Sequence, residues 1–106
     1  MRRTQLDEMT GGWFIGPFEP SVNQTSAFEC AVKRYSAGDN EAPHVHKVAT
    51  EYTVIVDGTV LVNGEKISSG TILEVAPGEA TQFTALTDAT TCVVKCPAVI
   101  GDKYLV

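Results

Sequence analysis

The sequence predicts an all-β fold, an antiparallel sandwich or barrel, and three observations lead to this prediction. Short runs rich in β-branched and aromatic residues follow one another along most of the chain after residue 26. Glycine, proline and asparagine separate these runs at short intervals. No long window carries the 3.6-residue apolar period of an amphipathic helix. Many short strands joined by such turns are typical of sandwiches and barrels.

Turn residues divide this region into segments that are each short enough for one or two strands. Ser36 to Asn40 form a loop, and Asn63-Gly64 predicts a tight hairpin, because both of its residues tolerate positive φ. Pro97 ends the last strand, since proline has no N–H to donate to a sheet. The expected strand regions are residues 27–35, 51–58, 59–67, 71–76, 81–86 and 90–96.

The chain is expected to form one domain over residues 1–106, with an N-terminal arm at 1–26 and a core at 27–97. Residues 4–10 are compatible with one helical turn or a coil. The segment WFIGPFEP at 13–20 is aromatic and interrupted by glycine and proline. We expect it to form a strand-like arm that packs across the barrel or across a partner subunit.

Charge and hydropathy exclude several classes of partner. The net charge of −5 gives a surface that repels phosphate backbones, so no nucleic-acid partner is expected. No apolar run approaches the roughly 18 to 20 residues that a membrane span needs, so no membrane partner is expected either. The N-terminus lacks the apolar stretch of a signal peptide, which predicts a cytoplasmic location.

The three cysteines do not have the spacing of a disulfide framework. Cys92 and Cys96 lie on one expected strand, where residues four apart are separated by roughly 13 Å, too far for a disulfide. We therefore expect Cys30, Cys92 and Cys96 to be free thiols that are buried as small apolar side chains.

The only two histidines of the chain stand together in the segment HVHKVATE. In an extended strand, residues i and i+2 point to the same face, so His44 and His46 project together. Glu51 begins the next strand and returns to the same region if the two strands pair antiparallel. Two imidazoles and one carboxylate form a site for a divalent transition metal such as Fe, Mn, Ni or Zn, with positions left open.

The segment GDNEAPHVHKVATEYTVIVDG resembles the first conserved motif of the cupin family. Gly38, His44, His46, Glu51 and Gly58 match its fixed positions. The resemblance covers roughly residues 27–97 and implies a double-stranded β-helix, or jelly-roll, cupin barrel. It also implies that a metal, where present, is held by the two histidines and the glutamate together with a histidine from a second motif.

That second motif is incomplete in this chain. In the stretch GTILEVAPGEATQF, the glycines Gly70 and Gly78 match, but Thr81 stands where the family has its histidine. If the alignment is anchored on Pro77 instead, Gln82 takes the ligand position, and its amide oxygen is a weaker metal ligand than imidazole. Neighbouring strand residues face opposite ways, so only one of Thr81 and Gln82 looks into the barrel. Gln82 is therefore a candidate fourth ligand.

Two further residues are candidates for binding a substrate. Arg34 shares strand parity with Val32 and Cys30, which predicts an arginine on an otherwise apolar face, either reaching a substrate carboxylate or phosphate or lying at the rim. Phe83 is expected to line the cavity.

Three functions are compatible with these residues. The first is a small metal-dependent cupin that acts on a small organic substrate, as an isomerase, epimerase or dioxygenase. The second is a barrel that binds a sugar or a carboxylate without turnover. The third is a metal-free sugar-modifying enzyme that uses His44 or His46 as a base. We also expect a homodimer, because the apolar arm would otherwise expose several large side chains.

Overall fold

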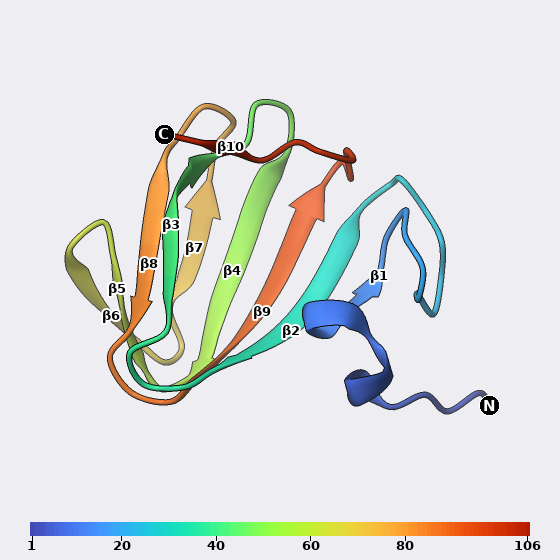
Figure 1. The fold of residues 1–106 in the computed structure, drawn as a ribbon, viewed down its shortest axis with the longest axis horizontal. Coiled ribbons are helices and arrows are strands. Elements are labelled where there is room, and N and C mark those ends of the chain that lie inside the picture. Colours follow the sequence, from blue (N-terminus) through green and yellow to red (C-terminus); the bar gives the residue numbers. More distant parts are fainter.

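The computed structural model describes residues 1–106, and about half of these residues are in strands. Two five-stranded antiparallel sheets face each other, with the orders β1-β2-β9-β4-β7 and β10-β3-β8-β5-β6 (Figure 1). The two helical elements are three-residue 3-10 turns, η1 (Leu6–Glu8) and η2 (Thr10–Gly12), and neither is long enough to cross a membrane. The strands are β1 (Trp13–Ile15), β2 (Glu29–Tyr35), β3 (Asn40–Val45), β4 (Thr50–Asp57), β5 (Thr59–Val62), β6 (Glu65–Ser68), β7 (Ile72–Val75), β8 (Thr81–Ala85), β9 (Ala89–Cys96) and β10 (Tyr104–Leu105).

The predicted all-β architecture is confirmed, and each expected strand region holds a strand. The hairpin between β5 and β6 turns at Asn63-Gly64, whose φ angles are 52° and 80°, in the left-handed region that this dipeptide tolerates. Strand β3 begins at Asn40, the last residue of the expected loop. Strand β10 lies in the C-terminal segment, for which the sequence predicts no element.

A cluster of buried apolar side chains fills one end of the barrel. Ile55, Val60, Ala85 and Ala89 form a buried cluster there. The chain turns from β4 into β5 at Gly58, whose φ is +88° and whose position leaves no room for a side chain, since a Cβ would lie 2.3 Å from the carbonyl oxygen of Asp88. The glycine that ends the first motif is therefore required by the close approach of the β8–β9 connection.

The two terminal segments attach to different sheets. Strand β1 extends the first sheet by pairing with β2, which brings Trp13 opposite Ala31, so the arm packs on its own barrel. The C-terminal segment crosses the opposite end of the barrel from the packed core, and its strand β10 pairs with β3 (Figure 1). It passes over the connection between β3 and β4, where the histidine segment lies.

The cysteines are free, as expected, but they are not uniformly buried. Cys30 is buried, Cys92 is half-buried and Cys96 is exposed. The expectation of three buried thiols is therefore correct for Cys30 only. Cys96 is the last residue of β9, where the strand leaves the sheet for the C-terminal segment.

Candidate metal centre

The two facing sheets each supply part of the candidate site. His44 is in β3 and His46 follows that strand directly, whereas Glu51 is in β4 of the other sheet. Both histidines are buried, at 7% and 3% relative exposure. One potential ligand atom from each of the three side chains lies within 4.8 Å of the other two. The structure therefore brings together the three residues that the first motif predicts as ligands.

The hydrogen bonds of the two imidazoles determine where their protons are. Nδ1 of His44 donates to the carbonyl oxygen of Ala42 at 3.0 Å, and Nδ1 of His46 donates to the carbonyl oxygen of Asp102. A carbonyl oxygen only accepts, so in each ring Nδ1 carries the proton. When the rings are neutral, Nε2 then has a free lone pair, which is the form that binds metals.

The charges at the site support one another. Nε2 of His46 lies 3.3 Å from Oε2 of Glu51. The Glu51 carboxylate raises the pKa of His46 above its ordinary value, against the opposing effect of burial. Burial works to raise the pKa of Glu51, but His46 and the Lys95 ammonium hold that pKa below its ordinary value. Glu51 is therefore ionised at neutral pH, as a metal ligand must be.

The residues present fit a metal ion. Nε2 of His46 is buried and forms no hydrogen bond, which is costly for a polar atom away from water. A divalent cation would satisfy this nitrogen, and the potential ligand atoms of the three side chains, all within 4.8 Å of one another, could hold it after they move closer together. Two imidazoles and a carboxylate are the set found in metal sites that keep open positions for substrate.

Thr81, not Gln82, occupies the place of the fourth ligand. In the pairing of β3 with β8, Thr81 lies directly opposite His44, and it lines the cavity between the sheets. The Gln82 side chain lies on the other side of β8, where its amide donates to the hydroxyl of Thr84 at 3.0 Å and to the carbonyl oxygen of Phe83 at 3.2 Å. The structure therefore does not bring Gln82 to the histidines, because strand alternation turns it away.

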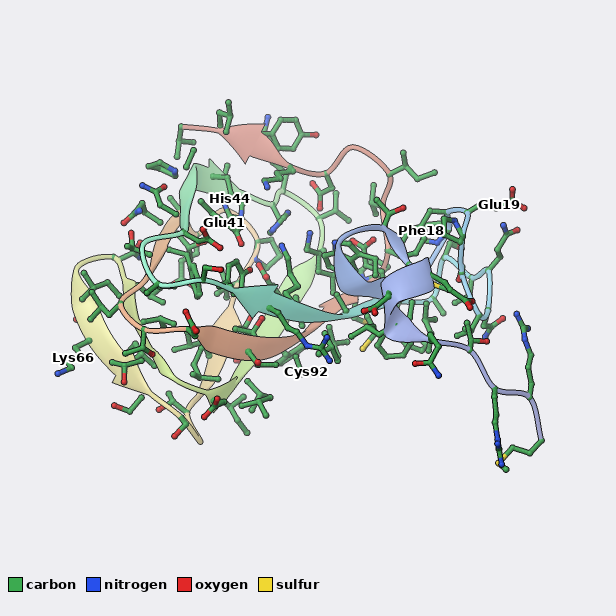
Figure 2. The ribbon with its side chains drawn as sticks, turned by 60° about the horizontal axis from the view of Figure 1, so that its bottom comes forward. Phe18, Glu19, Glu41, His44, Lys66 and Cys92 are labelled. Carbon is green, nitrogen blue, oxygen red and sulfur yellow. The ribbon has the colours of Figure 1, made fainter.

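A cavity of about 280 Å³ opens beside the three residues. His44 and Glu51 line it, and so does Glu41, which shares β3 with His44 (Figure 2). His46, at 3% relative exposure, is not among the residues that line it. Phe83 lines it as expected, and so do Trp13 of the arm and Tyr35 of β2. Arg34 does not line it, because the inward residues of β2 are Glu29, Lys33 and Tyr35. The side chain of Arg34 is 70% exposed on the outer face, 3.9 Å from Asp7.

Sequence reasoning missed a row of charges across the inner face of the first sheet. Lys95 of β9 pairs in register with Glu29 of β2 on one side and with Glu51 of β4 on the other. Its ammonium is 3.8 Å from Oε1 of Glu29 and 5.0 Å from the centre of the Trp13 ring. Strand alternation could have predicted the position of Lys95, because it lies on the same face of β9 as Thr91 and Val93, which line the cavity.

A second charged group lies further along the same cavity. The Tyr35 hydroxyl donates to Oε1 of Glu41 at 2.5 Å, and the Lys33 ammonium is 3.4 Å from the same oxygen. Burial, followed by the hydrogen bond to the Glu41 carboxylate, raises the pKa of Tyr35. The Glu41 carboxylate thus contacts Tyr35 and Lys33, whereas the Glu51 carboxylate contacts His46.

The chain is similar to known proteins in its structure but matches none of them by sequence. No protein-family model matches the sequence, and no curated protein matches it significantly. An uncharacterised conserved protein with a double-stranded β-helix domain from Klebsiella pneumoniae superposes with a TM-score of 0.73, at 20% identity over 98% of this chain and 90% of that one.

Two metal-containing proteins are also similar in structure. The bacterial pirin YhhW from Escherichia coli, in complex with nickel(II), gives a TM-score of 0.66 at 20% identity, over 82% of this chain and 39% of that one. Oxalate decarboxylase from Bacillus subtilis, which has Mn(II) centres, gives a TM-score of 0.66 at 16% identity, over 77% of this chain and 25% of that one. The matched structures also include proteins described as cupins. From its two facing sheets and these neighbours, the chain has the double-stranded β-helix fold of the cupins.

Proposed function

We propose that this chain is a cupin that binds a divalent transition metal through His44, His46 and Glu51. The observation that carries the proposal is the state of the two imidazoles. Each Nδ1 donates to a backbone carbonyl, which leaves each Nε2 free to bind a metal. Nε2 of His46 is buried 3.3 Å from Oε2 of Glu51 and forms no hydrogen bond. The nickel(II) and Mn(II) of two structural neighbours support the same class of metal.

We further propose that the metal-bound protein acts on a small organic molecule with an anionic group. Three lysines balance three glutamates among the residues that line the cavity, so a bound divalent cation leaves the cavity positively charged. The metal supplies Lewis-acid chemistry at a substrate oxygen, or reactivity toward dioxygen. Lys95 stands next to Glu51 to hold the anionic group, and Trp13 and Phe83 supply apolar walls that exclude water.

A metal-free barrel that binds a sugar or a carboxylate is the alternative. It is favoured by Thr81 in the place of a fourth ligand, since a neutral hydroxyl is a poor ligand for these metals. In that case His44 would serve as an acid–base or binding group at the cavity wall.

Elemental analysis of the untagged protein separates the two. The proposal predicts close to one transition-metal ion per chain after reconstitution with Mn(II), Fe(II), Ni(II) or Zn(II), and loss of the ion in His44→Ala/His46→Ala. Glu41→Gln is the matched control, because Glu41 is a carboxylate of the same cavity that does not face the histidines. Wild-type protein that takes up none of these metals would leave the metal-free alternative.

A further inference from the structure

Asp102 is a buried acid that does not belong to the proposed set of metal ligands. Its side chain is 6% exposed, although it belongs to the C-terminal segment and not to the paired strands of the barrel. Neither cupin motif covers this residue. A buried carboxylate requires partners, and the hydrogen-bond partners of the Asp102 carboxylate are all in the connection between β3 and β4.

The carboxylate accepts hydrogen bonds from three successive backbone N–H groups. The N–H of Lys47 donates to Oδ1 at 2.8 Å, that of Ala49 to Oδ2 at 2.9 Å, and that of Val48 to Oδ2 at 3.1 Å. These N–H groups follow His46 directly and precede the strand that carries Glu51. One carboxylate thus fixes the whole connection between two of the proposed ligands.

The backbone of the same residue fixes the imidazole itself. The carbonyl oxygen of Asp102 accepts the Nδ1 proton of His46, while the carbonyl oxygen of His46 accepts the N–H of Gly78 at 2.7 Å. The side chain of Asp102 locks the C-terminal segment onto the connection, and that lock places its carbonyl against the ring. An imidazole released from this bond distributes its proton over both nitrogens, which blocks Nε2 for part of the time.

We propose that Asp102 is a positioning residue for the metal ligand His46, acting as a clamp from the C-terminal segment. Its carboxylate holds the connection 47–49, and its carbonyl holds His46 in the tautomer whose Nε2 faces Glu51. The part of this inference that concerns metal affinity rests on the proposed function. The part that concerns the tautomer does not.

The test compares the full-length wild type with Asp102→Ala and Asp102→Asn. Asp88→Ala is the matched control, because Asp88 also accepts a backbone N–H, from Ala37 at 2.9 Å, but at the packed end of the barrel. Ni(II) affinity is measured by calorimetry, and the His46 tautomer in the metal-free protein by long-range ¹H–¹⁵N correlation spectra. Loss of a partner that orients a ligand typically weakens metal binding by about 10- to 100-fold.

We expect Asp102→Ala to weaken Ni(II) binding by about that factor and to shift His46 away from the Nδ1–H tautomer. Asp102→Asn keeps one acceptor oxygen, so its Ni(II) affinity and its His46 tautomer should be intermediate between those of the wild type and of Asp102→Ala. It serves as the test variant if the alanine variant does not fold. Asp88→Ala should match the wild type in both readouts. Unchanged tautomer and affinity in the Asp102 variants, or equal losses in Asp88→Ala, would overturn the proposal. Wild-type protein that binds no Ni(II) while the tautomer still shifts would count against the metal site alone.

Discussion

At the scale of single residues, the proposed metal binding depends on which ring nitrogen of His44 and His46 is free. Both Nδ1 atoms are committed to backbone carbonyls, so the chemistry of each ring is left to Nε2. The sequence predicts that these two residues and Glu51 meet, but through antiparallel pairing of their two strands, and that pairing is wrong. Strands β3 and β4 belong to different sheets, and the short connection between them brings Glu51 to the histidines across the barrel. The sequence does not predict the tautomers, because the carbonyl that holds His46 comes from Asp102, 56 positions away along the chain.

A pH dependence follows from the Tyr35–Glu41 pair in the same cavity. Burial works to raise the pKa of Glu41, but the Tyr35 hydroxyl and the Lys33 charge hold that pKa below its ordinary value of 4.5. A depressed folded-state pKa stabilises the fold above the unfolded pKa, and that contribution is lost as the pH falls through the folded value.

We expect a double-mutant cycle with Tyr35→Phe and Glu41→Gln to give a coupling of about 1.5–3 kcal/mol at pH 7, the range for hydrogen bonds to charged groups. Urea unfolding of the four proteins measures it. The coupling should shrink as the pH falls below about 4.5, where Glu41 of the unfolded chain takes up a proton, and it should be lost once the pH passes through the lower folded-state pKa of Glu41. A coupling that stays constant across this range would show that the carboxylate charge plays no part.

At the scale of elements, the sequence predicts where the strands begin and end, but it does not predict which face of β2 points into the barrel. Turn residues mark the ends of β4, β7 and β8, so their positions could be read from the sequence. The outward direction of Arg34 could not, because both faces of β2 carry apolar residues and the pattern fits either direction. Strand β10 has only two residues, and it is a strand because β3 offers it a partner.

The facing of β8 gives a direct prediction about the missing fourth ligand. Thr81→His should tighten Ni(II) binding by about tenfold or more, because the new imidazole would stand opposite His44 and face the cavity. Gln82→His, one residue further along the strand, should leave the affinity unchanged, since that side chain points away. Calorimetric titration of both variants measures the difference, and a larger gain from Gln82→His would reverse the assigned register.

The β4–β5 turn gives a stability prediction. Gly58→Ala should lower the free energy of unfolding by more than the roughly 1–2 kcal/mol of a left-handed alanine, because the added Cβ also meets the carbonyl oxygen of Asp88. Gly38→Ala is the control: its φ is +93°, but nothing lies within 4 Å of the added atom. Chemical denaturation should show a clearly smaller loss for Gly38→Ala. Equal losses would mean that the close approach is unimportant.

The whole molecule divides into a packed end and an open end. Aliphatic side chains fill the barrel around Ile55 and Val60, whereas the histidine end holds the cavity and is crossed by the C-terminal segment. The outer face of the first sheet carries exposed apolar side chains, among them Val56 at 55% and Ile72 at 66%. Since the arm packs on its own barrel, we expect this face, and not the arm, to form the contact if the chain pairs as a homodimer.

We expect light scattering coupled to size-exclusion chromatography to give about twice the chain mass of 11.4 kDa. Ile72→Glu should shift the protein to the monomer, because a carboxylate on this face is costly to bury between two copies. Lys66→Glu, on the other sheet, should not change the mass. A monomer for the wild type at all concentrations would contradict the expected dimer.

Anomalous scattering from crystals grown with Ni(II) tests whether His44, His46 and Glu51 hold one metal ion. We expect a single strong peak about 2.0–2.2 Å from Nε2 of each histidine and from a carboxylate oxygen of Glu51. Thr81 should stand beside an open coordination position that solvent or a small anion fills. A peak elsewhere on the chain, or no peak between these three side chains, would mean that they do not form the metal site.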